Sequence, residues 1–142
     1  ERRLDLRHAS DRTRERIRLL QSSITYDDDR LAGMDAAVLI EVIEPVDLDR
    51  LPAVESAVWG AARPGVVVVT TPNADYNTLY PQLPAGRFRH PDHRFEFTRA
   101  EFADWAARVA DRFGYAVAFR PDGQMVASAS TEATRFRQKS PA

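Results

Sequence analysis

The chain has no cysteine among its 142 residues, which excludes disulfides, thiolate metal sites and cysteine nucleophiles. Lysine is almost absent too, because Lys139 is the only one and every other cationic side chain besides histidine is an arginine. Arginine suits phosphate recognition through its planar fork, although a compositional bias shared with the many alanines explains the same pattern. The formal net charge is only −1, so contact with RNA or DNA would need a local basic patch.

Long apolar runs are also missing, and none approaches the roughly 20 residues that span a bilayer. The N-terminus has no apolar signal region, so we expect a soluble, cytoplasmic protein that does not act at a membrane. The six glycines are scattered singly and no G-x-G occurs. The length suits one domain with a real core.

Strands and helices are predicted to alternate between residues 17 and 130, after a charged lead-in over 1–16 and before a polar, frayed tail over 131–142. Such alternation predicts an α/β sheet. The predicted strands are Ile17–Leu20, 36–43 (covered on both faces), 66–71, 114–119 and 124–130. The predicted helices are 47–62, capped by Asp47, and 98–113, where Thr98 and Glu101 form a capping box. Residues 72–92 form a loop long enough to suggest a function.

Polar residues cluster where two predicted strands end, which is where ligands bind in α/β sheets. In "EVIEP", Glu41 and Glu44 lie three residues apart, so one turn of backbone can aim both carboxylates at one point. This arrangement suits a hard cation or an acid/base pair. Glutamates that start a helix, favoured by its dipole, explain the same spacing.

A second cluster, "RHPDHRFEFTR", brings His90 and His93 close to Asp92 and Glu96. A histidine joined to two carboxylates suits Mn²⁺, Fe²⁺, Co²⁺ or Zn²⁺ better than Mg²⁺. The alternative is that a histidine here only caps or packs under the loop.

Three stretches in register, "EVIE", "VVVVTTPNADYN" and "RHPDHRFEFTRAEFADWA", resemble the Hua enhancer family of small-RNA 3′-terminal 2′-O-methyltransferases, in its bacterial type. The resemblance runs from about Leu20 to Phe119. It implies the C-terminal portion of a class I (Rossmann-like) methyltransferase sheet that lacks the first two strands and leaves an edge of the 36–40 strand unpaired. The implied activity is methyl transfer from S-adenosylmethionine to the 2′-hydroxyl of an RNA 3′ end, in small-RNA protection or RNA repair, with a divalent metal, Mn²⁺ or else Mg²⁺ or Co²⁺.

The family's metal motif, Glu-x-x-Glu-His plus a distal His, matches here only in part. The resemblance places metal ligands at Glu41, Glu44 and His93, with His90 as second choice for the distal position. Pro45 stands where the family has the adjacent histidine, and Phe97 stands where it usually has tryptophan.

The resemblance also implies substrate and cofactor contacts. Ser23 and Ile24 would flank the adenine of the cofactor, whose Gly-rich turn is not found in this sequence. RNA with free 2′- and 3′-hydroxyls is the implied substrate, and an end-repair kinase–ligase is an implied partner. The candidate RNA-binding residues are Asn73, Tyr76, Asn77, Arg89, Arg94 and Arg99, although each arginine can equally pair with a nearby acid.

Three interpretations follow. In the first, the chain is a truncated form of such an enzyme and is inactive alone, because the Gly-rich cofactor motif is absent and Pro45 replaces a metal ligand. Alternatively, it is a non-catalytic relative that binds RNA ends with a degenerate metal site, as Pro45 suggests. The third possibility is an α/β scaffold that assembles only with a partner chain.

Overall fold

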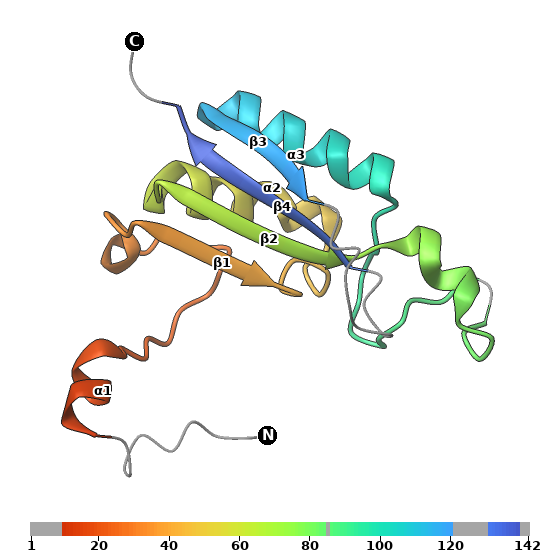
Figure 1. The fold of residues 1–142 in the computed structure, drawn as a ribbon, viewed down its shortest axis with the longest axis horizontal. Coiled ribbons are helices and arrows are strands. Elements are labelled where there is room, and N and C mark those ends of the chain that lie inside the picture. Colours follow the sequence, from red (N-terminus) through yellow and green to blue (C-terminus); the bar gives the residue numbers. More distant parts are fainter. Residues whose placement is uncertain (1–9, 85, 121–130, 140–142) are drawn as a thin grey trace.

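The computed structural model describes residues 10–84, 86–120 and 131–139, and centres on a mixed sheet of four strands in the order β1-β2-β4-β3 (Figure 1). Strand β1 (Ala36–Ile40) runs parallel to β2 (Val66–Pro72). Strand β4 (Thr131–Gln138) is antiparallel both to β2 and to β3 (Tyr115–Arg120). The predicted α/β class is therefore confirmed.

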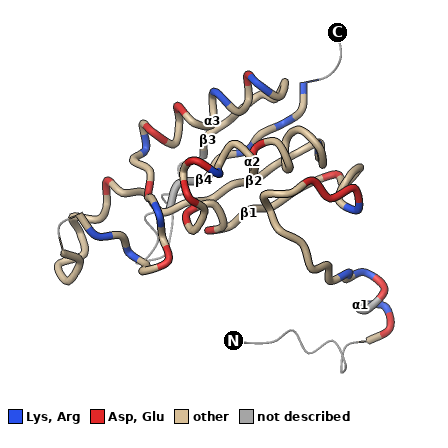
Figure 2. The backbone as a smooth tube through the Cα atoms, turned by 180° about the vertical axis from the view of Figure 1, so that it is seen from behind, with Lys and Arg blue, Asp and Glu red and all other residues tan. Residues whose placement is uncertain are grey.

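Two helical segments cover one face of this sheet. The first comprises the 3₁₀ turn η3 (Leu48–Arg50), helix α2 (Leu51–Glu55) and the π-helix η4 (Ser56–Ala62). The second is α3 (Arg99–Phe113), whose outer face carries charges of both signs (Figure 2). The rings of Trp59 and Trp105 lie 5.0 Å and 6.2 Å from that of Phe136 on β4. These aromatic contacts join both helical segments to the centre of the sheet and form the core.

The expectation that the first buried strand is covered on both faces is wrong for β1. Leu39 faces the helices and is buried, but Val38 and Ile40 point the other way and are each 61% exposed. Within the described residues β1 pairs only with β2, so its other edge is open, as the resemblance implied.

Two further expectations about elements are corrected. Residues Ile17–Leu20 form no strand and follow a short exposed helix, α1 (Asp11–Arg16). The tail expected to be frayed instead contains β4, which lies between β2 and β3. The strand expected at 124–130 lies outside the described residues.

The helix starts agree with the sequence in one case and differ in the other. Thr98 and Glu101 form the expected capping box at the start of α3. Asp47 precedes η3 but its side chain makes no capping hydrogen bond. The long loop holds a single 3₁₀ segment, η5 (Ala74–Leu79), and another short one, η2 (Asp29–Leu31), precedes β1. No helix in the described part of the chain is long and apolar enough to cross a membrane.

Candidate metal and RNA-end site

The carboxyl ends of β1 and β2 meet at one edge of the sheet, because the strands are parallel and Ile40 pairs with Thr70. The segment before α3 returns to this edge. The Arg94 N–H donates to the Glu44 carbonyl oxygen, and the Ala74 N–H donates to the Phe97 carbonyl oxygen, both at 2.8 Å. These backbone bonds bring together the two polar clusters that the sequence separates.

Glu41 occupies the first position after β1 in a left-handed conformation, with φ of 53°. Its N–H donates to the Thr70 carbonyl oxygen at 3.1 Å, and the Thr70 hydroxyl donates to Glu41 Oε1 at 3.4 Å. The positive φ turns the chain sharply out of the sheet. It is an uncommon conformation for a residue other than glycine, asparagine or aspartate.

Glu44 is fully buried, and neither of its carboxylate oxygens has a hydrogen-bond partner in the described structure. Burial raises its pKa, and the Glu41 carboxylate raises it further. The Thr71 hydroxyl and the backbone N–H of Glu44 lie close enough to favour the charged form, as does His93, although neither donor meets the distance and angle of a hydrogen bond to the carboxylate. A buried carboxylate without donors is costly, so this group is suited to receive a cation.

His93 is held by a carboxylate through one of its two ring nitrogens. Its Nδ1 lies 2.7 Å from Oε1 of Glu96, and the two side chains are 12% and 0% exposed. Although burial alone raises the pKa of Glu96, hydrogen bonds from Asn77, His93 and the Arg89 N–H outweigh it and lower that pKa. Glu96 is therefore an ionised acceptor, and the Nε2 atom of His93 is left outside this bond.

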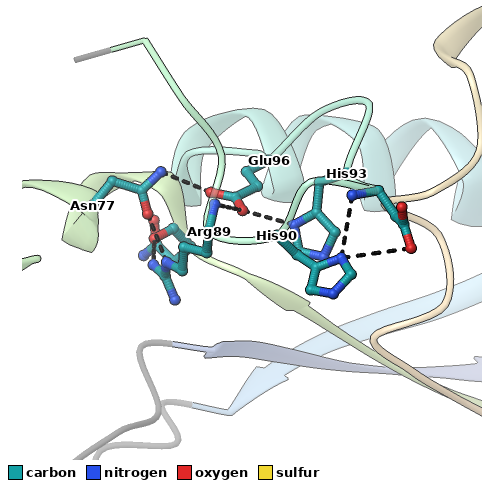
Figure 3. A network of polar contacts seen from close by, with 7 residues as sticks. Asn77, Arg89, His90, His93 and Glu96 are labelled. Atoms are coloured by element: carbon teal, nitrogen blue, oxygen red, sulfur yellow. Dashed lines mark hydrogen bonds and ion pairs between the residues drawn. The ribbon is translucent and has the colours of Figure 1, made fainter. Parts of the chain in front are cut away.

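His90 lies beside His93, with ring centroids 5.5 Å apart, but its environment differs (Figure 3). Its side chain is 57% exposed, and its Nδ1 accepts a hydrogen bond from the Asp92 N–H at 3.2 Å. His93 is the more buried and more firmly held of the two.

Asn77 and Arg89, both candidates for RNA contact, lie in a network around Glu96 (Figure 3). Asn77 Nδ2 donates to Glu96 Oε2 at 2.7 Å, and Arg89 Nε donates to Asn77 Oδ1 at 2.6 Å. The Arg89 guanidinium also donates to the Asn73 carbonyl oxygen and lies over the Tyr80 ring, 4.9 Å from its centroid. Both side chains thus have intramolecular partners.

The other candidates for RNA contact lie around the same loop. Asn73 is buried and its Oδ1 accepts from the Asp75 N–H at 2.8 Å, which starts η5. Tyr76 is 37% exposed. Arg94 pairs with Asp47 at 3.5 Å, and the exposed Arg99 follows Thr98.

The candidate cofactor residues lie in the irregular segment that precedes η2. The Ser23 hydroxyl is 2.9 Å from that of Thr25, and Ile24 is partly buried against the core. Arg50 donates to the Thr25 hydroxyl at 3.4 Å, which links this segment to η3.

Among the described residues, no group of three or more His, Cys, Asp or Glu side chains is arranged closely enough to hold a metal ion. The donor types nevertheless fit a divalent cation, because Glu44 offers two unpaired oxygens, Glu41 lies close enough to raise its pKa, and His93 lies close enough to lower it. Pro45, exposed next to Glu44, offers no side-chain ligand. The sequence places Glu96 near His93, and their i,i+3 spacing is the one sign in the sequence of the contact that the structure shows between them.

The sheet has one parallel and two antiparallel strand pairings, helices on one face, and polar groups at the strand ends. This is an α/β fold of the kind seen in Rossmann-like methyltransferase domains. The methyltransferase domain of bacterial CtHen1 superposes with a TM-score of 0.80 at 41% identity, over 95% of this chain and 69% of that one. The small RNA methyltransferase HEN1 superposes at 0.73 with 30% identity, over 86% of this chain and 16% of that one.

The chain belongs to the small RNA 2′-O-methyltransferase family. The Xenopus tropicalis protein of that name is 42% identical over 71% of this chain and 27% of its own length; the Drosophila melanogaster one is 35% identical over 69% and 26%. The chain thus spans about a quarter of these curated relatives. No protein-family model matches it. The resemblance that the three motifs predicted is confirmed.

Proposed function

We propose that this chain forms the part of an RNA 3′-terminal 2′-O-methyltransferase that holds a divalent metal and the RNA end. The observation that carries the proposal is the buried Glu44 carboxylate, whose oxygens have no hydrogen-bond partner among the described residues and which lies near Glu41 and His93. The family names supply the reaction class, since the relatives are small RNA 2′-O-methyltransferases.

Glu41, Glu44 and His93 would hold the ion, with Mn²⁺ as the preferred metal and Mg²⁺ or Co²⁺ as substitutes. When bound, the ion would supply Lewis-acid chemistry, which lowers the pKa of a nearby hydroxyl such as the ribose 2′-hydroxyl. The residues would place the ion: Glu44 lies out of contact with solvent, and the sharp turn at Glu41 directs the chain from β1 towards it.

The RNA end would meet the loop between β2 and α3. Tyr76 has exposed ring surface on which a base can stack, and Arg94 and Arg99 lie at exposed positions from which a guanidinium can meet phosphates. Asn73, Asn77 and Arg89 stay predicted RNA contacts, although their side chains are engaged within the loop.

S-adenosylmethionine is the proposed methyl donor, with Ser23 and Ile24 beside its adenine. The chain has no G-x-G turn. We therefore place the main cofactor contacts outside these residues, in an enzyme of which this chain forms a part. A kinase–ligase that repairs RNA ends is the proposed partner on family grounds alone.

Pro45 favours a second candidate, a non-catalytic relative that binds RNA ends with a degenerate metal site. It follows Glu44 directly at an exposed position and cannot ligate through its side chain. A site that has lost an imidazole should bind metal more weakly, by about 10- to 100-fold if the loss resembles that of an outer-shell partner.

The test is a Mn²⁺ titration by calorimetry on the chain and on Pro45→His, with Pro45→Ala as the matched control and circular dichroism to show that all are folded. We expect weak binding by the chain and by Pro45→Ala, and binding at least tenfold tighter by Pro45→His. Equal tight binding by all three would show that the protein ligands present suffice and would remove the argument for degeneracy. No binding by any folded variant would overturn the proposed site.

A further inference from the structure

A chain of polar contacts runs through the loop before α3 and ends at the Nδ1 atom of His93. Glu96 sits at its centre: Oε1 accepts from the Arg89 backbone N–H at 2.8 Å and lies 2.7 Å from Nδ1 of His93, and Oε2 accepts from Asn77 at 2.7 Å. Each oxygen of this buried carboxylate thus has a donor. The carboxylate cannot rotate without losing at least one of these bonds.

The donors that hold Glu96 are themselves held. Arg89 Nε donates to Asn77 Oδ1 at 2.6 Å, which orients the amide so that its NH₂ group points at Glu96. The Arg89 guanidinium is fixed in turn by the Asn73 carbonyl oxygen and by the face of Tyr80. The network therefore runs from the end of β2 to His93 across the long loop (Figure 3).

An ionised carboxylate accepts hydrogen bonds and donates none. With Glu96 opposite Nδ1, the proton of neutral His93 must sit on Nδ1, and the lone pair must sit on Nε2. The tautomer of a metal-binding histidine is set in this way by the partner of its other nitrogen.

We infer that Glu96 is a positioning residue, oriented by Asn77 and Arg89, that fixes His93 with Nδ1–H towards the carboxylate and Nε2 free to bind the metal. The inference rests on the proposed function for the identity of what Nε2 binds. The state of His93 in the metal-free chain does not depend on that function. The two can therefore fail separately.

The first readout is the tautomer of His93, measured by ¹⁵N NMR on histidine-labelled, metal-free chain at a pH where the ring is neutral, and assigned with His93→Gln. We expect Nδ1–H in the wild-type chain and a mixture of both tautomers in Glu96→Ala. Asp92→Asn removes an exposed carboxylate from the same loop and should leave the His93 signals unchanged. Nε2–H in the wild-type chain, or the same tautomer in Glu96→Ala, would overturn the inference.

Substitutions that exchange the donor and acceptor groups of Glu96 and Asn77 distinguish a positioning role of Glu96 from a role in stability alone. In Glu96→Gln the new amide NH₂ faces a donor, either Asn77 Nδ2 or the Arg89 N–H together with the His93 ring. In the double variant with Asn77→Asp, the new amide NH₂ can donate to the carboxylate introduced by that second substitution, while the new amide oxygen still accepts from His93. We therefore expect Glu96→Gln to disturb the tautomer and the double variant to restore it.

The second readout is Mn²⁺ affinity, which connects the positioning to the proposed site. Glu96→Gln should bind Mn²⁺ about 10- to 100-fold more weakly, and the double variant should recover part of that loss. If Glu96→Ala does not fold, Arg89→Lys serves instead, because it keeps the backbone N–H to Glu96 and removes the guanidinium that orients Asn77, together with its contacts to the Asn73 carbonyl oxygen and the Tyr80 ring. Nδ1–H in a wild-type chain that binds no Mn²⁺ would support the positioning role while the proposed metal site fails.

Discussion

At the scale of single residues, Glu44 has the most unusual environment in the described part of the chain, since its fully buried carboxylate has no donor. A metal-free chain must either bury this charge or keep the group protonated, and its raised pKa indicates the second tendency. If the proposed ion binds Glu44, it should stabilise the fold, because it would bind the folded chain and not the unfolded one.

Glu44→Gln should remove a pH dependence of stability from the metal-free chain. The folded pKa of Glu44 lies above its ordinary value of 4.5, so the folded state holds this proton more firmly than the unfolded one. The free energy of unfolding should thus fall as pH rises from about 4.5 towards the raised pKa, and the variant should lose this decrease. At pH 8 it should be more stable by about 1 kcal/mol, the order of an unsatisfied buried group.

Urea unfolding at a series of pH values, with chelator present, measures this effect. Asp92→Asn, an exposed carboxylate, is the control and should behave as the wild type. A variant less stable than wild type at every pH would show that Glu44 has partners in solution that the structure lacks.

At the scale of elements, helix α3 holds the end of the site segment in place. The Glu101 N–H donates to the Thr98 hydroxyl at 3.2 Å, and the Thr98 N–H donates to Glu101 Oε2 at 2.8 Å. Thr98→Ala should lower the free energy of unfolding by about 1 kcal/mol because it removes the cap. Chemical denaturation checks this, with the exposed Thr78→Ala as control. Equal effects of the two substitutions would show that the cap contributes little.

The elements that the sequence predicted well are those with a strong apolar pattern. Strand β2 and helix α3 were placed within a few residues because β2 contains an unbroken run of four valines and the apolar side chains of α3 recur with a helical period. Strand β4 was missed because one of its faces is not covered by the helices: Arg135 and Arg137 alternate with the buried Thr134 and Phe136, so the segment reads as a polar tail.

The site was predictable only as far as residue types and spacing reach. Glu41, Glu44 and His93 stood out in the sequence as candidate ligands, and as ligands they stay predictions. The role of Glu96 depends on its contact with a neighbouring side chain, and the orientation of Asn77 depends on Arg89, twelve residues away. The i,i+3 spacing of His93 and Glu96 is the one sign of their contact in the sequence. The contact between Asn77 and Arg89 forms only once the loop has folded, so periodicity and composition carry no sign of it.

At the scale of the whole molecule, β4 joins parts of the sheet that are distant in sequence. It pairs with β2 over seven residue positions and with β3 over six. Removing residues 131–142 should therefore leave β3 without a strand partner and abolish cooperative unfolding, measured by near-ultraviolet circular dichroism during urea titration. Removing 1–16, which include the exposed helix α1, should leave the transition in place. Cooperative unfolding without β4 would contradict this assignment.

Because the backbone of Glu41 is left-handed, thermal stability and Mn²⁺ binding should favour different residues at this position. A residue with a Cβ costs about 1–2 kcal/mol in this conformation, so Glu41→Gly should raise the melting temperature. Glu41→Ala, which keeps the strain and loses the same carboxylate, should not, while both variants should bind Mn²⁺ more weakly in calorimetry. A laboratory selection for heat resistance alone would thus favour glycine at this position and lose the proposed metal ligand, whereas a selection for Mn²⁺ binding should retain the less stable glutamate.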